Sequence, residues 1–194
     1  MKPIIFSTPM VQAIQDGRKT QTRRVIKGDI LPGWDQKLQC PSYLRIKDGK
    51  PYGKSVVCPY PSGTVLWVRE TWAKVSDWVD VDSEVGIPDG YIYKADWQDG
   101  TESPKWRPSI HMPKEAARLF LLVENVRVER LQDITEEDAQ ADGVYPCYEK
   151  HLHYDGREYR CSFEQLWDSL NAKRGHPYTY SSNPWVWAIE FNKG

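Results

Sequence analysis

The sequence predicts an α+β domain built around a small mixed β-barrel, with short helices packed at the openings of the barrel. Two observations lead to this fold class. About six segments alternate apolar and polar residues as strands do, whereas about three short segments show the spacing of an amphipathic helix. The segments also lack the strand–helix–strand order of a doubly wound parallel sheet. A chain of 194 residues suits a single domain, which we expect to span residues 1–194.

The first third of the chain is expected to form a strand, a helix and an insertion, in that order. Residues 3–7 are typical of a short strand, and Thr8 can cap a helix that ends at Gly17. Residues 28–62 are interrupted by prolines and glycines throughout, so we expect an inserted loop or hairpin there and not a second core. The strand at 63–73 follows, and apolar residues on both faces at its start indicate a closed or covered sheet.

Four further strands are predicted in the rest of the chain, at 91–97, 106–112, 118–131 and 183–191. The longest of them, 118–131, changes its apolar phase at Glu124–Asn125, as a β-bulge would cause. Residues 74–90 are acidic and are expected to form a loop.

Two helices are predicted after the longest strand. A capping box at Asp133 and Glu136 predicts a helix over 134–142. A second insertion is expected at about 144–161. The clearest helix then spans 162–174, is capped by its first residue, and has apolar residues at i, i+3, i+4 and i+7.

Composition narrows the function classes. The formal net charge of −1 speaks against binding of long duplex nucleic acid, which normally requires a broad basic surface. No apolar run could span a bilayer and no secretory signal is visible, so we expect a cytoplasmic protein without a membrane partner. The four cysteines show no C-x-x-C spacing, so we expect neither a metal site nor a cofactor. His151 and His153, which lie between Cys147 and Cys161, are the alternative as zinc ligands.

Basic residues gather directly after the predicted first helix. Five of them lie within residues 18–27, and this basic cluster consists of Arg18, Lys19, Arg23, Arg24 and Lys27. On a nearly neutral chain, such a cluster indicates one anion-binding site. Arg18 and Lys19 can alternatively cap the helix C-terminus, where cations complement the helix dipole. Because a cap needs fewer than five cations, we favour the binding interpretation.

The basic cluster contains the pattern Gly17-x-Lys19-x-x-x-x-Arg24, which resembles the signature of the ASCH domain family. Other segments are similar to the longer, phage- and prophage-associated ASCH proteins, namely GTVLWVRETW, WRPSIHMP, VRVERLQDITEEDA, FEQLWDSLN and NPWVWAIEF. Together they span most of the chain outside the two insertions. The resemblance implies a PUA-like barrel whose cleft accepts RNA or a modified nucleoside, as a single-stranded or flipped base.

A small bacterial branch of that family hydrolyses the acetyl amide of N4-acetylcytidine with a lysine, a threonine and a glutamate. The resemblance assigns these catalytic positions to Lys19, Thr22 and Asp142, the last being one methylene shorter than glutamate. Glu137 and Asp138 are alternatives for the acid. The chemistry is consistent, because crowding by cations lowers the pKa of a lysine until it can deprotonate a threonine nucleophile. An acid can then protonate the leaving amine.

The remaining residues of the motif are expected to bind the ligand or support the site. Gly17 turns the chain, and Arg24 holds a phosphate or an oxyanion. Arg18 and Arg23 supply supporting positive charge.

Three ligand-binding candidates lie outside the motif. Glu70 follows an apolar strand face and would need Arg69 or the basic cluster as a partner, so a structural ion pair is the alternative to a role in the site. His111 has the chemistry of an acid or base but stands alone in the sequence. Most tryptophans are expected in the core, with Trp106 as the one that stacks on a base.

Three hypotheses of function follow from these observations. The first is a hydrolase that acts on a nucleoside or RNA through Lys19, Thr22 and an acid. The second is a non-catalytic binder of RNA or of a modified nucleoside. The third is a phage-type regulatory protein that binds a partner through its insertions.

Overall fold

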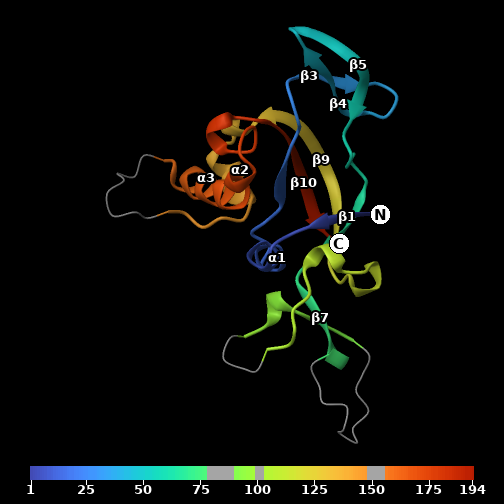
Figure 1. The fold of residues 1–194 in the computed structure, drawn as a ribbon, viewed down its shortest axis with the longest axis vertical. Helices are drawn as coiled ribbons and strands as arrows, with labels where there is room; N and C mark the ends of the chain where they lie inside the picture. Colours follow the sequence, from blue (N-terminus) through green and yellow to red (C-terminus); the bar gives the residue numbers. More distant parts are fainter. Residues whose placement is uncertain (78–89, 99–102, 148–155) are drawn as a thin grey trace, which may run out of the picture.

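The computed structural model describes residues 1–77, 90–98, 103–147 and 156–194. The fold is α+β, with mostly strands and few helices, as the sequence predicts (Figure 1). Its centre is a sheet of five strands in the order β1 (Lys2–Ile5), β6 (Val65–Arg69), β9 (Phe120–Arg130), β10 (Trp185–Lys193) and β2 (Gln21–Val25). β1 and β6 run parallel, and all other neighbours in this sheet are antiparallel.

β1 and β2 form the two edges of this sheet. No backbone ladder joins them among the described residues, so a closed barrel is not confirmed. A side chain bridges them instead, because Nη2 of Arg24 on β2 donates a hydrogen bond to the carbonyl oxygen of Ile5 on β1 (2.8 Å). The sheet therefore curls far enough to bring its edges within reach of one side chain, and the seam between β1 and β2 is where the candidate site lies.

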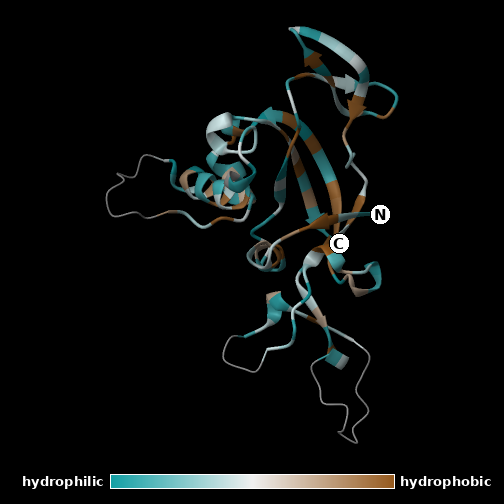
Figure 2. Ribbon diagram, viewed as in Figure 1, coloured by the Kyte–Doolittle hydropathy of each residue, from teal (hydrophilic) through white to brown (hydrophobic). Residues whose placement is uncertain are grey.

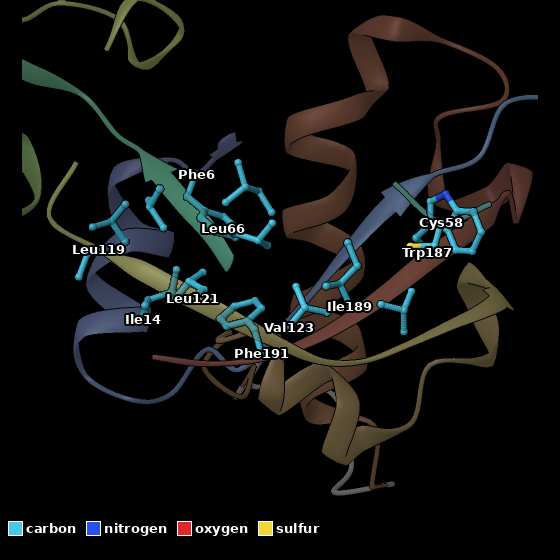
Figure 3. Close-up of a cluster of buried hydrophobic side chains, with 14 of the residues drawn as sticks. Phe6, Ile14, Cys58, Leu66, Leu119, Leu121, Val123, Trp187, Ile189 and Phe191 are labelled. Carbon is cyan, nitrogen blue, oxygen red and sulfur yellow. The ribbon is translucent and has the colours of Figure 1, made fainter. Parts of the chain in front are cut away.

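The main core lies between the curled sheet and α1 (Thr8–Gln15) (Figure 3). Leu66, Leu121 and Ile189, from three neighbouring strands, are completely buried, and Ile14 of α1 joins them. The prediction of apolar residues on both faces of 63–73 is confirmed, because three consecutive residues of β6, from Leu66 onwards, are buried.

The predicted bulge in β9 is confirmed. Asn125 pairs with Glu190, but the next pair joins Val123 to Phe191, so the register of the ladder skips Glu124. The shift keeps apolar side chains on the core face of both halves of the strand. In Figure 2 the first part of β9 is continuously hydrophobic, and hydrophobic and hydrophilic residues alternate only after the bulge.

The segment expected as an inserted loop or hairpin forms a second sheet. It consists of β3 (Ile30–Asp35), β4 (Cys40–Lys47) and β5 (Lys50–Val57), paired antiparallel in that order. This sheet has no separate core, which agrees with the sequence prediction, because Tyr43 packs against Trp187 of β10 with ring centroids 5.7 Å apart.

The region before β9 is less extended than the sequence predicts. β7 (Trp72–Lys74) pairs with β8 (Tyr91–Tyr93), but the predicted strand 91–97 turns into a 3-10 helix at Lys94–Asp96. The prediction of extended structure at 106–112 is wrong at Ser109–His111, which forms another 3-10 helix. Its first turn closes because the amide of His111 donates to the carbonyl of Pro108 (3.0 Å). Most of the acidic loop at 74–90 lies outside the described residues.

Helix α2 (Glu136–Ala141) begins at a different cap from the one predicted. Thr135 is the N-cap, and its hydroxyl accepts a hydrogen bond from the amide of Asp138 (3.1 Å), so the capping box at Asp133 is wrong. The N-cap of α1 is Ser7 and not Thr8. No helix within the described residues is long and apolar enough to cross a membrane.

Helix α3 (Glu158–Asn171) begins four residues before the predicted position at 162. The reason is a contact with α2, since the Glu136 carboxylate accepts hydrogen bonds from the amides of Tyr159 (2.8 Å) and Arg160 (3.2 Å) in the first turn of α3. Residues 158–161, which were predicted to end the second insertion at 144–161, therefore belong to α3. Residues 148–155 of that insertion lie outside the described part of the chain.

Candidate functional site

The turn after α1 brings the basic cluster against the end of α2. Gly17 adopts a positive φ of 76°, which reverses the chain as predicted. Lys19 then forms an isolated β-bridge with Asp142. Gly143 permits this close approach, because its φ is 89° and a Cβ there would lie 2.8 Å from the Cβ of Lys19. Two segments more than a hundred residues apart are thus packed backbone to backbone.

Lys19, Arg23 and Asp142 form a buried ion cluster, with 3%, 4% and 5% of their surface exposed. Nζ of Lys19 donates to Oδ1 of Asp142 (3.1 Å) and to its backbone carbonyl (2.8 Å). Nη1 of Arg23 donates to Oδ2 of the same carboxylate. Asp142 therefore serves two cations at once, and hydrogen bonds satisfy the charges that burial would otherwise penalise.

Arg23 extends the cluster toward the surface. Its Nε donates to Glu129 (2.9 Å), while Nη2 lies 3.2 Å from Asp138 without forming a hydrogen bond. Arg127 on β9 pairs with Glu129 (2.7 Å), Asp138 (2.6 Å) and Glu190. Asp138 is therefore engaged by arginines, and it does not contact Lys19 as an alternative acid would.

The pKa of Lys19 is lowered from its ordinary value of 10.5. Burial is the main cause, and the charges of Arg24 and Arg23 act in the same direction, while Asp142 opposes the shift. Both Lys19 and Arg24 also lie over the ring of Phe6, at 5.6 and 5.3 Å from its centroid. Of the three arginines expected to crowd Lys19, Arg23 and Arg24 therefore act on its pKa, whereas Arg18 is not among the causes of the shift.

A cavity of about 620 Å³ opens beside this cluster. One wall is polar and comes from the seam of the sheet, with Thr22 and Arg24 of β2 and Ser7 before α1. Another part of the lining comes from α3 and includes two aromatic side chains, Phe163 and Trp167, which we call the aromatic wall. Asp142 lines the cavity, whereas Lys19, which donates to Asp142, is not among the lining residues.

Arg18 borders a neighbouring cavity of about 890 Å³, which also contains Asp142 in its lining. Its guanidinium pairs with Asp16 (2.9 Å), donates to the carbonyl of Gly143 (2.8 Å) and stacks on Tyr145 at 4.2 Å from the ring centroid. Arg18 therefore holds the turn against Gly143 and lines the neighbouring cavity, and it is not among the residues that line the 620 Å³ cavity.

Glu70, Trp106 and His111 do not join the basic cluster. Glu70 is 1% exposed and forms two hydrogen bonds of 2.9 Å with Arg118, so the prediction of Arg69 or the basic cluster as its partner is wrong. This pairing could not be predicted from the sequence, because Arg118 lies 48 residues after Glu70 in the chain.

The other two candidates lie elsewhere on the molecule. Trp106 packs edge-on against Trp97 (5.6 Å between centroids), and His111 is exposed in its 3-10 helix. Ser109, two residues before His111, is the member of this segment that lines the 620 Å³ cavity.

The sequence prediction missed the aromatic wall of the cavity. Phe163 and Trp167 have the helical spacing of core residues, and they do contact the second core cluster. Helical spacing cannot distinguish a side chain that only fills a core from one that also lines a cavity. Arg174, which also lines the cavity just beyond α3, was missed for the same lack of a local signal.

Metal binding has no support within the described residues, where no group of three or more His, Cys, Asp or Glu side chains is placed to hold an ion. His151 and His153 lie outside these residues. Comparison of the chain with family models, with curated proteins and with solved structures found no match.

Proposed function

We propose that the 620 Å³ cavity binds a single base of RNA or a modified nucleoside. The observation that carries the proposal is the pairing of an aromatic wall, from Phe163 and Trp167, with a wall of hydroxyl and guanidinium groups, from Thr22 and Arg24. Aromatic side chains stack on bases, and the polar groups can bind their edges or a phosphate. The volume falls within the range of about 300–1,000 Å³ that is typical of ligand sites.

Two further observations support this function. The formal net charge of −1 suits recognition of one unpaired base better than binding of a duplex. The resemblance to ASCH proteins supports a PUA-like fold, in which the curled sheet is a barrel left open at the seam that Arg24 bridges. That resemblance implies a cleft that accepts RNA or a modified nucleoside.

Binding is tested by titrating cytidine, N4-acetylcytidine and a short single-stranded RNA into the protein. Leu166→Glu places a charge at the cavity, whereas Gln165→Glu places the same charge on the exposed side of α3. We expect Leu166→Glu to weaken binding at least about tenfold, or 1.4 kcal/mol, and Gln165→Glu to leave it unchanged. If both variants bind the ligand equally well, the ligand does not bind in this cavity. Failure of the wild type to bind any of the three would favour the partner-binding hypothesis.

Hydrolysis of the amide of an N-acylated cytidine is the second candidate, favoured by the lowered pKa of Lys19. Neutral Lys19 would take the proton of the Thr22 hydroxyl, whose oxygen then attacks the acyl carbon. As the C–N bond breaks, the Lys19 ammonium returns the proton to the leaving amine, and water later hydrolyses the ester on Thr22. Asp142, which accepts from both Lys19 and Arg23, would position Lys19. This candidate ranks second because Lys19 does not itself line the cavity.

Turnover of N4-acetylcytidine by the wild type, Lys19→Ala, Thr22→Ala and the exposed control Thr20→Ala tests the second candidate. We expect the first two variants to lose activity and Thr20→Ala to keep it. Because the neutral amine is the reactive form, the rate should rise with pH and level off at the lowered pKa of Lys19, below 10.5. Turnover that survives both Lys19→Ala and Thr22→Ala would refute this chemistry.

A further inference from the structure

A second cavity, of about 370 Å³, lies on the other side of Arg24 at the edge of the sheet. It is lined by Pro3, Ile4 and Ile5 of β1 together with Arg24, Tyr60 and Arg69. The two arginines approach Ile5 of β1 from either side, Arg69 from β6 and Arg24 from β2 across the seam. Arg69 is the register partner of Ile5 across the β1–β6 pair, and Arg24 donates to the carbonyl of Ile5 (2.8 Å). Two guanidinium groups and a phenol thus converge on one small cavity.

Neither of these arginines is neutralised within the described part of the chain. Arg23, Arg118 and Arg127 each pair with two or more carboxylates, whereas Arg24 and Arg69 have no carboxylate within 4.0 Å among the residues that are placed. The partners of Arg69 are the carbonyl of Ile110 and the ring of Trp67, whose centroid is 5.5 Å away.

The Nε of Arg69 is buried and lacks a hydrogen-bond acceptor. A buried N–H without an acceptor is unfavourable, and so are two neighbouring cations without a counter-ion. An anion in this cavity would balance the charge of the two guanidinium groups that line it. The planar guanidinium group offers paired N–H donors that match the oxygens of phosphate, and the Tyr60 hydroxyl is a further donor.

We propose that Arg24, Arg69 and Tyr60 form a phosphate-binding site, so that the ligand of this protein is a nucleotide or a phosphodiester strand and not a free nucleoside. The assignment of the phosphate to a nucleotide rests on the proposed function, because the base would occupy the 620 Å³ cavity. Arg24 lines both cavities, so one guanidinium group would lie between the base and its phosphate. A free inorganic phosphate has the same recognition chemistry and is the other possible occupant.

Calorimetric titration of the wild type with four probes distinguishes a nucleotide from inorganic phosphate as the occupant of the cavity. The probes are cytidine, cytidine 5′-monophosphate, cytidine 3′-monophosphate and inorganic phosphate. We expect at least one monophosphate to bind roughly ten- to hundredfold more tightly than cytidine, with a steeper loss of affinity as salt increases. Equal affinity for cytidine and both monophosphates, without phosphate binding, would overturn the site. Binding of phosphate without any binding of cytidine would support the site and instead refute the base cavity.

Arg69→Gln and Tyr60→Phe test the residues, with Arg45→Gln as the control because Arg45 is an exposed arginine that lines neither cavity. We expect Arg69→Gln to weaken monophosphate binding about tenfold or more while cytidine binding is unchanged, and Tyr60→Phe to have a smaller effect in the same direction. Unchanged monophosphate binding in both variants would overturn the proposal. If circular dichroism shows that Arg69→Gln is unfolded, Tyr60→Phe and competition by inorganic phosphate decide the question.

Discussion

At the scale of single residues, the charge balance of the buried ion cluster depends on Asp142. It is the carboxylate shared by Lys19 and Arg23, and all three side chains are buried. Attraction between buried charges compensates for lost hydration only while every partner is present. The carboxylate therefore has a structural role whether or not the protein is an enzyme, and a stability measurement can detect that role.

Asp142→Asn should destabilise the fold by about 3–5 kcal/mol, because it leaves the buried Lys19 without the carboxylate that pairs with it and removes one of the carboxylates paired with Arg23. Asp16→Asn is the matched control, since Asp16 pairs with Arg18 at the surface and its side chain is 55% exposed. The control should cost no more than about 1 kcal/mol. Urea unfolding of both variants checks this comparison. Equal losses of stability would show that the cluster around Asp142 contributes no more than a surface ion pair.

At the scale of elements, α2 determines where α3 begins. Glu136 is the first residue of α2, and its carboxylate accepts two amides of the first turn of α3. Those amides have no partner inside their own helix, so the contact replaces an ordinary N-cap. Because α3 supplies the aromatic wall of the 620 Å³ cavity, this contact also positions the candidate site.

Glu136→Ala should therefore destabilise the protein by about 1–2 kcal/mol, as loss of a helix cap does. Glu137→Ala removes the same charge from the same turn but from an exposed side chain, and should change stability by no more than about 0.5 kcal/mol. Hydrogen exchange gives a local measurement, since the amides of Tyr159 and Arg160 should exchange faster only in Glu136→Ala. Unchanged exchange at these two amides would contradict the capping role.

Elements with local signals were predictable from the sequence. Gly17 ends α1 because only its backbone adopts the required positive φ easily, and the bulge at Glu124 is visible as a change of apolar phase. The start of α3 was not predictable, because it depends on Glu136 in another helix. The inserted sheet was also underestimated, since its strands contain prolines and glycines, such as Pro32 and Gly33 in β3 and Pro51 and Gly53 in β5, which normally indicate turns and loops.

The candidate site was predictable in part. Resemblance to ASCH proteins, and not any spacing in the sequence, put Lys19 and Asp142 together, and the structure places them 3.1 Å apart. The second cavity had no such signal. Arg69 and Tyr60 are brought beside Arg24 by the register of β1 with β6 and by the curl of the sheet, which are properties of the folded chain.

At the scale of the whole molecule, the five-stranded sheet and the inserted sheet of β3, β4 and β5 share one hydrophobic core. Tyr60, which follows the inserted sheet, lines the proposed phosphate site on the five-stranded sheet. Ile30, Tyr43 and Cys58 from the insertion belong to the same buried cluster as Trp187. The insertion therefore contributes to both the core and the candidate site, and its removal would be expected to damage both.

Tyr43→Ala should lower the stability of the entire fold by about 3 kcal/mol or more, because it opens a cavity against Trp187 in the shared core. Tyr52→Ala, an exposed tyrosine of the same sheet, should change stability by no more than about 0.5 kcal/mol. Since both sheets share one core, unfolding of Tyr43→Ala should remain a single transition, with tryptophan fluorescence and far-ultraviolet circular dichroism changing at the same urea concentration. An early transition confined to part of the signal would show instead that the inserted sheet unfolds independently, and that the core does not unite the molecule.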